Sequence, residues 1–456
     1  MSKREKRIGP KATEKHVRPS LPQVREHNPR RPWPSKPGTP TSVTHYLAQA
    51  GLTARLPENL SDADLVARFG DAARQYIRSC RLDHCDNVED HALMSANLDM
   101  ALTIRSQIWG DRFEALLSWF TTANLPRPGR ILDIGCDIGL QTCFYAMFFP
   151  DSQVTGIDQC AKSIQCAQRL AERMRLKNVG FLPATLPDLP DNLVNQKFDL
   201  VVSSCIAGHF YDEPTIPVRS VEEAHSQPLS QRLMEYARLL GGFLADENSL
   251  LVAFDRFQIP TVLARWIWAL RDAGIYVDRD RIELLEFVDE SEDSVYAPVM
   301  AGTRRTAELI TPDEIRELWM EGFLQHGGDV AFRHAAAEYF FVSESPKELL
   351  KGYRCMPPGL PPYCKEIWKS GSDVLIYLYE DGGVMIDAAP VEDLPKILDA
   401  LRISARENRV GWSVEEYGPE AYPQPHAAPI DRNAADRPTE ETPDSATATE
   451  SDDPDA

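Results

Sequence analysis

Between residues 130 and 288, short apolar runs typical of buried strands alternate with longer segments whose apolar residues return every three or four positions. The strand-like runs are RILDIG, QVTGID, VGFLPA, FDLVVSS, SLLVAFD and IELLEFV. The helical segments between them include LQTCFYAMFF, AKSIQCAQRLAERMRL, LSQRLMEYARLL and TVLARWIWALRDAG. Because strands that are apolar on both faces must be covered on both sides, this alternation predicts an α/β fold with a doubly wound, mostly parallel sheet.

The flanking sequence divides the rest of the chain into four further regions. We expect a helical lead-in over 43–124, before the α/β domain at 125–300, and a small α+β appendage over 301–412. In the appendage, an Asp-Gly-Gly turn between two apolar runs predicts a β-hairpin. Residues 1–42 are rich in proline and basic residues, and residues 413–456 are rich in Pro, Ala, Thr and acid. Both ends are therefore expected to be disordered.

Charge and cysteine content narrow the partners that we expect. The net charge is −20. The basic arm at 1–42 and the acidic tail carry opposite charges that nearly cancel, so the folded middle is strongly acidic. An acidic body repels phosphate backbones, so nucleic acid is expected at most as a weak partner of the basic arm. Nine cysteines, an odd number, lie mostly inside apolar patterns, and no apolar run is long enough for a secretory signal or a membrane span. We therefore expect a cytoplasmic protein with reduced thiols and no membrane contact.

The segment ILDIGCDIG, followed by VTGIDQCAKSIQCA, carries the features of a ligand-binding crevice. Gly135 and Gly139 permit a sharp turn after the first strand and a close approach of a ligand to the backbone. Asp133 lies at the carboxyl end of that strand. Asp158 ends the next strand, where a carboxylate can accept both hydroxyls of an adenosine ribose. The pattern predicts a nucleoside-containing cofactor.

A dinucleotide such as NAD is the first alternative for such a site. The G-x-G-x-x-G pattern starting at Gly135 would require glycine at Asp137 and Gly or Ala at Leu140, and both positions differ. An acidic Asp137 would also repel a pyrophosphate. A cofactor with a sulfonium and an ammonium group tolerates such acids, so the charge of the loop favours S-adenosylmethionine (SAM).

In these motifs, LDIGCDIG and GIDQCAKSIQCA, the sequence resembles the class I, Rossmann-like SAM-dependent methyltransferases, over about residues 125–300. The resemblance implies that Asp133 lies near the methionine moiety, that Gly135 and Gly139 shape the turn, and that Asp158 binds the ribose. It implies that four further residues belong to the cofactor site: Cys136, Gln159, Thr185 and Ser203. Two positions depart from the family pattern. Asp137 replaces the usual middle glycine, and Thr185 replaces an adenine-contacting acid.

The fourth strand ends as FDLVVSSCIAGHFYD, and the methyl acceptor of this fold lies beyond that end. Many small-molecule methyltransferases have a histidine where this chain has His209, five residues after Ser204, and the resemblance implies that His209 is a catalytic base. A histidine that only packs or caps the loop is the alternative. Cys205 resembles the nucleophile of cytosine C5 methylation in position, but no proline precedes it, so we interpret it as a structural thiol.

A zinc site is the remaining candidate for chemistry. Cys80, His84, Cys85 and His91 form a cluster, but no second spaced pair accompanies it, and we predict no metal. The sequence thus predicts a SAM-dependent methyltransferase whose acceptor is a small molecule or a protein. A nucleic-acid methyltransferase and a catalytically silent SAM-binding or scaffold protein remain as alternatives.

Overall fold

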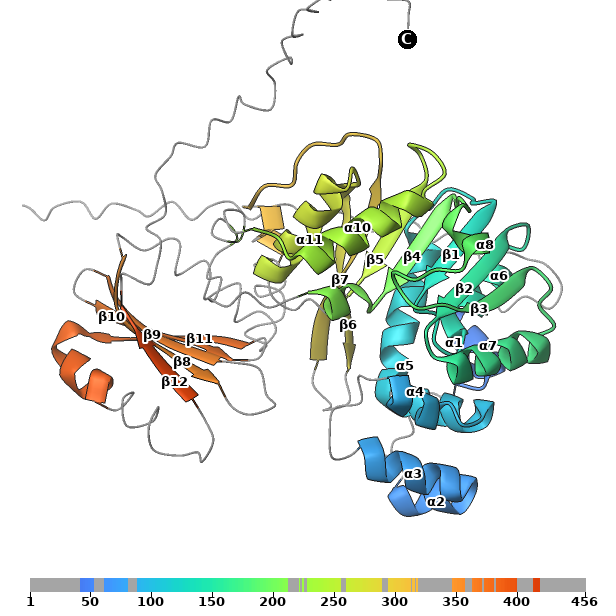
Figure 1. The fold of residues 1–456 in the computed structure, drawn as a ribbon, viewed down its shortest axis with the longest axis horizontal. Helices are drawn as coiled ribbons and strands as arrows, with labels where there is room; N and C mark the ends of the chain where they lie inside the picture. The colour runs from blue at the N-terminus through green and yellow to red at the C-terminus, as the bar shows by residue number, and fades with distance from the viewer. Residues whose placement is uncertain are drawn as a thin grey trace, which may run out of the picture. The chain divides into compact units, whose positions relative to one another are not determined.

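The computed structural model (Figure 1) describes most of the central part of the chain. The described residues are 42–52, 61–80, 88–211, 221, 224, 228–255, 260–288, 294–312, 314, 315, 317, 318, 347–356, 363–370, 373–380, 383–399 and 413–418. They divide into two compact units, 1–341 and 342–456, and each unit is considered by itself. The basic arm at 1–41, and the tail from 419, lie outside the described residues, so their expected disorder stays a prediction.

The first unit is built on a seven-stranded sheet with the strand order β3-β2-β1-β4-β5-β7-β6. Its strands are β1 (Arg130–Ile134), β2 (Gln153–Asp158), β3 (Val179–Pro183), β4 (Leu200–Ser204), β5 (Leu250–Phe254), β6 (Tyr276–Val288) and β7 (Ser294–Thr303). The first five strands pair in parallel, with Asp133 opposite Gly156 on one side and Val202 on the other. The expected doubly wound, mostly parallel α/β fold is confirmed. The strand order reverses at β1 and β4, and this switch point opens a crevice at their carboxyl ends.

One strand near the end of the sheet, β7, runs opposite to the other six. β7 pairs antiparallel with both β5 and β6. It extends from 294 to 303, so the sheet continues three residues beyond the expected domain boundary at 300. Burial explains this extension, because Ala297, Val299 and Ala301 belong to the apolar core under the sheet.

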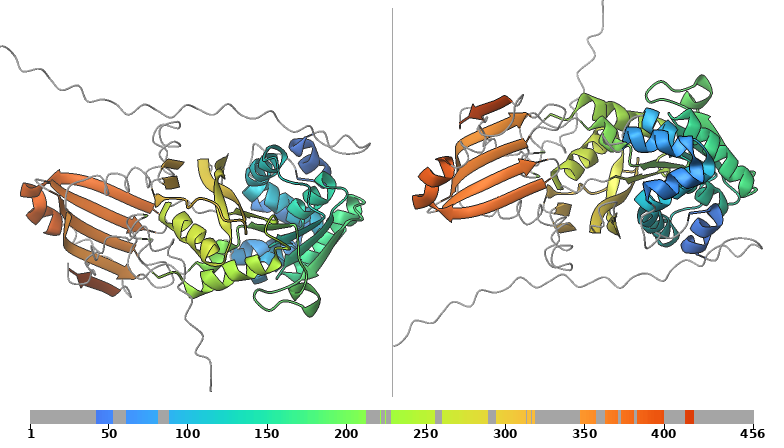
Figure 2. Two further views of the ribbon diagram at one scale, coloured as in Figure 1. Left: turned by 90° about the horizontal axis from the view of Figure 1, so that it is seen from above. Right: turned by 90° about the horizontal axis from the view of Figure 1, so that it is seen from below.

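Helices cover both faces of the sheet, as the two views in Figure 2 show. The connecting helices are α6 (Leu140–Phe148), α7 (Ala161–Arg173), α8 (Asp191–Val194), α10 (Gln231–Phe243) and α11 (Pro260–Asp272), with a 3-10 turn η1 (Ala207–Phe210) after β4. One apolar core joins one sheet face to α6 and α7. The other core joins the opposite face to α10 and α11, where Trp266 is fully buried.

The expected helical lead-in consists of α1 (Val43–Ala50), α2 (Asp62–Phe69), α3 (Asp71–Cys80), α4 (Val88–Met94) and α5 (Leu98–Thr122). The long helix α5 begins at an Asn97 cap, whose side chain accepts the Met100 N–H. Residues of α1 and α5 share one apolar core with β1 and α6, and the Tyr46 hydroxyl donates to the Leu140 carbonyl at 2.5 Å. Helices α1 and α5 are therefore packed onto the sheet, whereas residues of α2 and α3 form a separate apolar cluster with α4 and α5.

The second unit contains an antiparallel sheet with the order β11-β10-β9-β8-β12. Its strands are β8 (Lys347–Met356), β9 (Tyr363–Ser370), β10 (Asp373–Glu380), β11 (Gly383–Pro390) and β12 (Ser413–Tyr417). β10 and β11 form the hairpin expected at the Asp-Gly-Gly turn. The expected tail boundary at 413 is wrong for β12, which pairs with β8. This strand is short and lies at the sheet edge, where it pairs with β8 through its main chain. Its sequence shows no apolar run, so the strand could not be recognised from the sequence.

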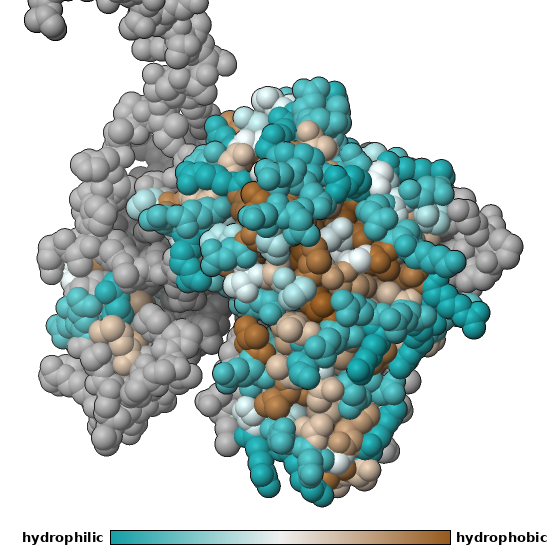
Figure 3. Space-filling model, turned by 45° about the vertical axis from the view of Figure 1, so that its right-hand side comes forward, coloured by the Kyte–Doolittle hydropathy of each residue, from teal (hydrophilic) through white to brown (hydrophobic). Residues whose placement is uncertain are grey.

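On the face drawn in Figure 3, hydrophilic side chains cover most of the described surface, and apolar ones gather in its middle. Among the helices that the structure describes, none is both long enough and apolar enough to cross a bilayer. None of the seven cysteines whose side chains are described forms a disulfide.

Candidate active site

A cavity of about 700 Å³ lies at the carboxyl ends of the parallel strands. Its walls come from the turn after β1, the end of β2, the segment after β4 and the end of β5, together with α4, α5 and α10. This volume lies within the range of small-molecule and cofactor sites. The cavity brings together Gly135, Cys136, Asp158, Gln159 and His209, all of which the sequence analysis assigns to the site.

The turn after β1 depends on Gly135. Its φ is +72°, and a Cβ atom added there would lie 2.2 Å from Ile206 Cδ1. The main-chain N–H groups of Gly135 and Cys136 both donate to the Ile157 carbonyl at 2.9 Å, which fixes the turn against β2. A side chain at position 135 would therefore clash with the segment after β4 and strain the backbone.

Gly139 begins helix α6 and serves packing. Its φ is +79°, and a Cβ atom there would lie 2.8 Å from Ala167 Cβ and 2.9 Å from the Phe181 ring. Its N–H donates to the Cys136 carbonyl at 2.8 Å, which closes the turn. Gly139 is not among the residues that line the cavity. Its position thus allows α6 to approach α7 and β3 closely.

Asp158 ends β2 and faces the cavity beside Gln159. Its carboxylate accepts the N–H of Asp137 at 2.9 Å and the N–H of Cys160 at 2.8 Å. Burial and the nearby charge of Asp137 raise the pKa of Asp158 to about 6, so the carboxyl is mostly ionised at pH 7. The cavity wall therefore carries an anionic acceptor at the end of β2, and the expected contact of Asp158 with a ribose stays a prediction.

Asp133 is fully buried under the turn. Its Oδ2 accepts the Thr142 hydroxyl at 2.6 Å, while Oδ1 has no hydrogen-bond partner among the described residues. Burial raises the pKa of Asp133 to about 7. A buried carboxyl oxygen without a partner is costly. Asp133 is not among the residues that line the cavity, so its expected contact with the methionine moiety stays a prediction.

Asp137, which replaces the middle glycine of the family pattern, forms a buried ion pair. Its carboxylate receives two hydrogen bonds from Arg105 of α5, at 2.7 and 2.8 Å, and one from Ser163 at 3.0 Å. Burial alone would raise the pKa of Asp137, but the charge and hydrogen bonds of Arg105 outweigh burial and lower it to about 2. The φ of Asp137 is +46°, a left-handed conformation that Asp tolerates better than most residues. This carboxylate is neutralised by Arg105, so it does not supply the free charge toward a cofactor that its sequence position suggested.

The other residues assigned to the cofactor site differ in where they lie. Cys136 lines the cavity, and burial raises the pKa of its thiol well above the usual range. Thr185 is exposed and does not line the cavity, whereas its neighbours Ala184 and Leu186 do. Ser203 is buried and is not among the residues that line the cavity, and its hydroxyl forms a hydrogen bond with the Tyr236 hydroxyl at 2.6 Å. The adjacent Ser204 lines the cavity in its place.

The segment after β4 forms the acceptor end of the cavity. His209 lies in η1 with an exposed side chain, and its carbonyl accepts a hydrogen bond from Arg232 at 3.0 Å. Cys205 also lines the cavity, with a φ of +58°. Its sulfur accepts a hydrogen bond from Arg112 Nη1 at 3.4 Å. His209 therefore lines the cavity, and its role as a base stays a prediction.

Sequence reasoning missed the residues that α5 and α10 contribute. Trp109, Arg112 and Phe113 of α5 and Arg232 of α10 line the cavity, and the end of β5 adds Asp255. On α5, the spacing of Arg105, Trp109 and Arg112 puts all three on one helix face, and this spacing is the signal that could have revealed them.

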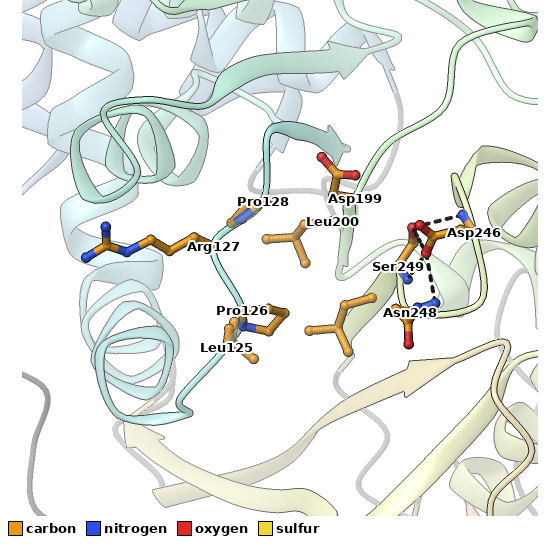
Figure 4. Close-up of a pocket in the computed structure, with 10 residues that line it drawn as sticks. Leu125, Pro126, Arg127, Pro128, Asp199, Leu200, Asp246, Asn248 and Ser249 are labelled. Atoms are coloured by element: carbon orange, nitrogen blue, oxygen red, sulfur yellow. Dashed lines mark hydrogen bonds between the residues drawn. The ribbon is translucent and has the colours of Figure 1, made fainter.

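Two other candidate sites carry no function that we can assign. His91 lines the cavity and stacks against Trp109, with 6.3 Å between the ring centres, while His84 and Cys85 lie outside the described residues. Within the described part of the chain, no group of three or more His, Cys, Asp or Glu residues could hold a metal ion. A separate pocket of about 140 Å³ (Figure 4) lies at the opposite, amino ends of β1, β4 and β5. Its Asp199 is already used to bind two main-chain N–H groups.

Comparison with known proteins places this site in a family. Residues 127–235 match a family model described as "Methyltransferase domain". This segment contains the turn after β1, Asp158 and the segment after β4. The fold, the site and this match define a class I, Rossmann-like SAM-dependent methyltransferase domain.

Individual relatives match smaller parts of the chain. The release factor glutamine methyltransferase of Shigella dysenteriae is 34% identical over 83 residues, which are 18% of this chain and 29% of that protein. The ribosomal RNA small subunit methyltransferase G of Streptococcus suis is 30% identical over 120 residues, 26% of this chain and 51% of that protein. An O-methyltransferase family protein from Burkholderia thailandensis superimposes with a TM-score of 0.31 at 12% identity, covering 58% of this chain and 73% of its own. The chain thus spans about half or less of the length of these two curated relatives.

Proposed function

We propose that the protein transfers the methyl group of SAM to a small-molecule or protein acceptor bound at the segment after β4. The observation that carries this proposal is the single cavity that joins the glycine turn and Asp158 to His209. A cofactor held by the first two groups and an acceptor beside the third would share one enclosed space. The thioether of SAM is already a good leaving group. Catalysis therefore comes mainly from holding the cofactor and the acceptor together in the right orientation.

The residues of the cavity fit SAM in charge and shape. Asp158 lines the cavity as an anionic acceptor suited to ribose hydroxyls. Gly135 leaves the backbone bare where a ligand must approach it. When bound, SAM would supply the methyl group of its sulfonium, and the remainder of the cofactor would leave as a neutral thioether.

On the acceptor side, the protein orients the reactants and manages one proton. Trp109, Phe113 and Phe210 form apolar walls that exclude water from the acceptor. As the acceptor atom takes the methyl carbon, its proton must leave, and the imidazole of His209 is the base that we assign to this step. The proton ends on the His209 ring and passes to solvent, to which the side chain is exposed.

Binding and turnover test the proposal separately. Isothermal titration calorimetry should show that the purified full chain binds SAM and its demethylated product, S-adenosylhomocysteine, in preference to NAD. Incubation with methyl-labelled SAM and a small-molecule extract or a protein extract should then transfer label to one of these fractions. A preference for NAD would refute the cofactor. Binding without transfer to any fraction would refute the enzyme and favour a silent SAM-binding protein.

A further inference from the structure

Arg105 of α5 belongs to a largely buried polar network beside the cofactor turn. Its Nε and Nη2 donate to the two carboxylate oxygens of Asp137 at 2.8 and 2.7 Å, and Nη2 also donates to Ser95 Oγ at 3.2 Å. Ser163 of α7 donates to Asp137 Oδ1 and shares a hydrogen bond with Ser95, each at 3.0 Å. Arg105, Ser95 and Ser163 are almost fully buried. The network therefore connects α5 and α7 to the turn after β1.

The network reaches Asp158 through the main chain of Asp137. The Asp137 N–H donates to Asp158 Oδ2 at 2.9 Å, and the Cys160 N–H donates to Asp158 Oδ1 at 2.8 Å. Each carboxylate oxygen of Asp158 is thus oriented by one main-chain N–H and keeps a further lone pair. Asp158 lines the cavity, so this arrangement suits two neighbouring hydroxyl groups of a ligand.

Two acids lie next to each other at this turn, and Arg105 compensates the charge of one of them. Burial and then the charge of Asp137 raise the pKa of Asp158, whereas the charge of Arg105 lowers it. The side chain of Asp137 is 18% exposed, so little water could replace the guanidinium. Without Arg105, the turn would have to move to hydrate the Asp137 carboxylate. The N–H that orients Asp158 belongs to the same residue and would move with it.

We propose that Arg105 is a positioning residue for the cofactor: by pairing with Asp137, it holds Asp158 in the orientation that selects a ribose with both hydroxyls. This inference rests on the proposed function and extends cofactor recognition to a helix outside the matched segment 127–235. A site built to bind a hydroxyl rejects the analogue that lacks it, because its own polar groups are then left unpaired. Helix α5 is therefore part of the cofactor site as well as of the core.

The ratio of affinities for two cofactor analogues tests this inference. The full chain would be titrated calorimetrically at pH 7 with S-adenosylhomocysteine and with its 2′-deoxy analogue. The unmodified protein should prefer S-adenosylhomocysteine by roughly tenfold or more. In Arg105→Met, the preference should fall to less than about threefold. Because both ligands bind only the folded protein, a smaller folded fraction weakens both apparent affinities equally and leaves their ratio unchanged.

Two further variants separate the charge pair from packing. Arg105→Met combined with Asp137→Gly removes the unpaired carboxylate but keeps the N–H at position 137, so it should regain most of the preference. Arg173→Gln breaks the exposed Arg173–Asp99 ion pair between the same two helices and should leave the preference unchanged. If Arg105→Met does not fold, Arg105→Lys takes its place. Lysine keeps the charge but not the two-point contact, so its preference should fall by roughly threefold or more.

The possible contrary results have distinct meanings. If Arg105→Met keeps the full preference, if the double variant fails to regain it, or if Arg173→Gln loses it equally, the charge pair does not position Asp158 and the inference is overturned. Equal binding of the two analogues by the unmodified protein would overturn it as well, since Asp158 would then select no ribose hydroxyl. Failure of the unmodified protein to bind S-adenosylhomocysteine would instead refute the proposed function.

Discussion

Removing Arg105 should destabilise the protein because it leaves the Asp137 carboxylate, whose side chain is 18% exposed, without its counter-charge. The guanidinium donates to both carboxylate oxygens, and its own side chain is fully buried. The pKa of Asp137 falls from the usual 3.8 to about 2, a difference of about 1.8, which corresponds to about 2.5 kcal/mol of differential interaction. Loss of one partner from a buried pair also leaves an uncompensated charge, so Arg105→Met should cost about 3–5 kcal/mol.

Comparing Arg105→Met with a double variant that also lacks the Asp137 carboxylate tests whether the unpaired carboxylate causes the loss of stability. Arg105→Met should lower the melting temperature by roughly 6–20 °C in calorimetric or fluorescence melts at pH 7. Adding Asp137→Gly removes the stranded carboxylate, and glycine accepts the φ of +46° without strain. The double variant should therefore recover most of the lost stability. If the double variant melts no higher than Arg105→Met, the ion pair is not the source of the loss and the reasoning is refuted.

Three further changes probe the rest of the site. Asp158→Asn should weaken SAM binding by roughly 10–150-fold in calorimetry, since a charge-assisted contact to the ribose is lost, and unchanged affinity would contradict its placement. His209→Ala should keep SAM affinity and lower label transfer by about 10²–10⁴-fold, whereas a parallel loss of thermal stability would favour a packing role. Asp255 has a folded-state pKa of about 8, raised by burial from 3.8, so its stabilising contribution is fully present below about pH 4 and is lost as the pH rises through about 8. Urea denaturation at pH 6 and pH 9 should thus show a smaller loss of stability in Asp255→Asn than in the unmodified protein, and equal losses would contradict the assigned burial.

The parallel part of the fold could be predicted because each of its strands and helices has a recognisable local sequence pattern. Strands such as β1 and β5 are continuous apolar runs, and the helices between them show the 3.6-residue period. β7 was not anticipated, since its antiparallel pairing with β5 and β6 is decided by contacts between segments far apart in the chain. The same holds for β12, whose five residues are a strand only because the edge of β8 is available.

The cofactor end of the site could likewise be predicted from local signals, and the acceptor end could not. Gly135 and Asp158 follow strands at positions that the fold itself brings to the crevice. The direction of a side chain at a strand end is less certain. Ser203 was expected in the cofactor site but turns toward Tyr236, because successive residues of a strand face opposite sides of the sheet. Arg112 and Arg232 come from helices whose approach to β4 depends on tertiary packing.

The long helix α5 contributes residues to both the cofactor end and the acceptor end of the cavity. It was expected only as part of a helical lead-in, yet Arg105 fixes the turn of the cofactor end and Arg112 lines the acceptor end, about two helical turns further along. Position 137 of the glycine turn can hold an acid only because Arg105 neutralises it. The departure from the family pattern in the turn is therefore explained by a residue outside the matched segment 127–235. Since the same helix carries Arg112, α5 contributes side chains to both ends of the cavity.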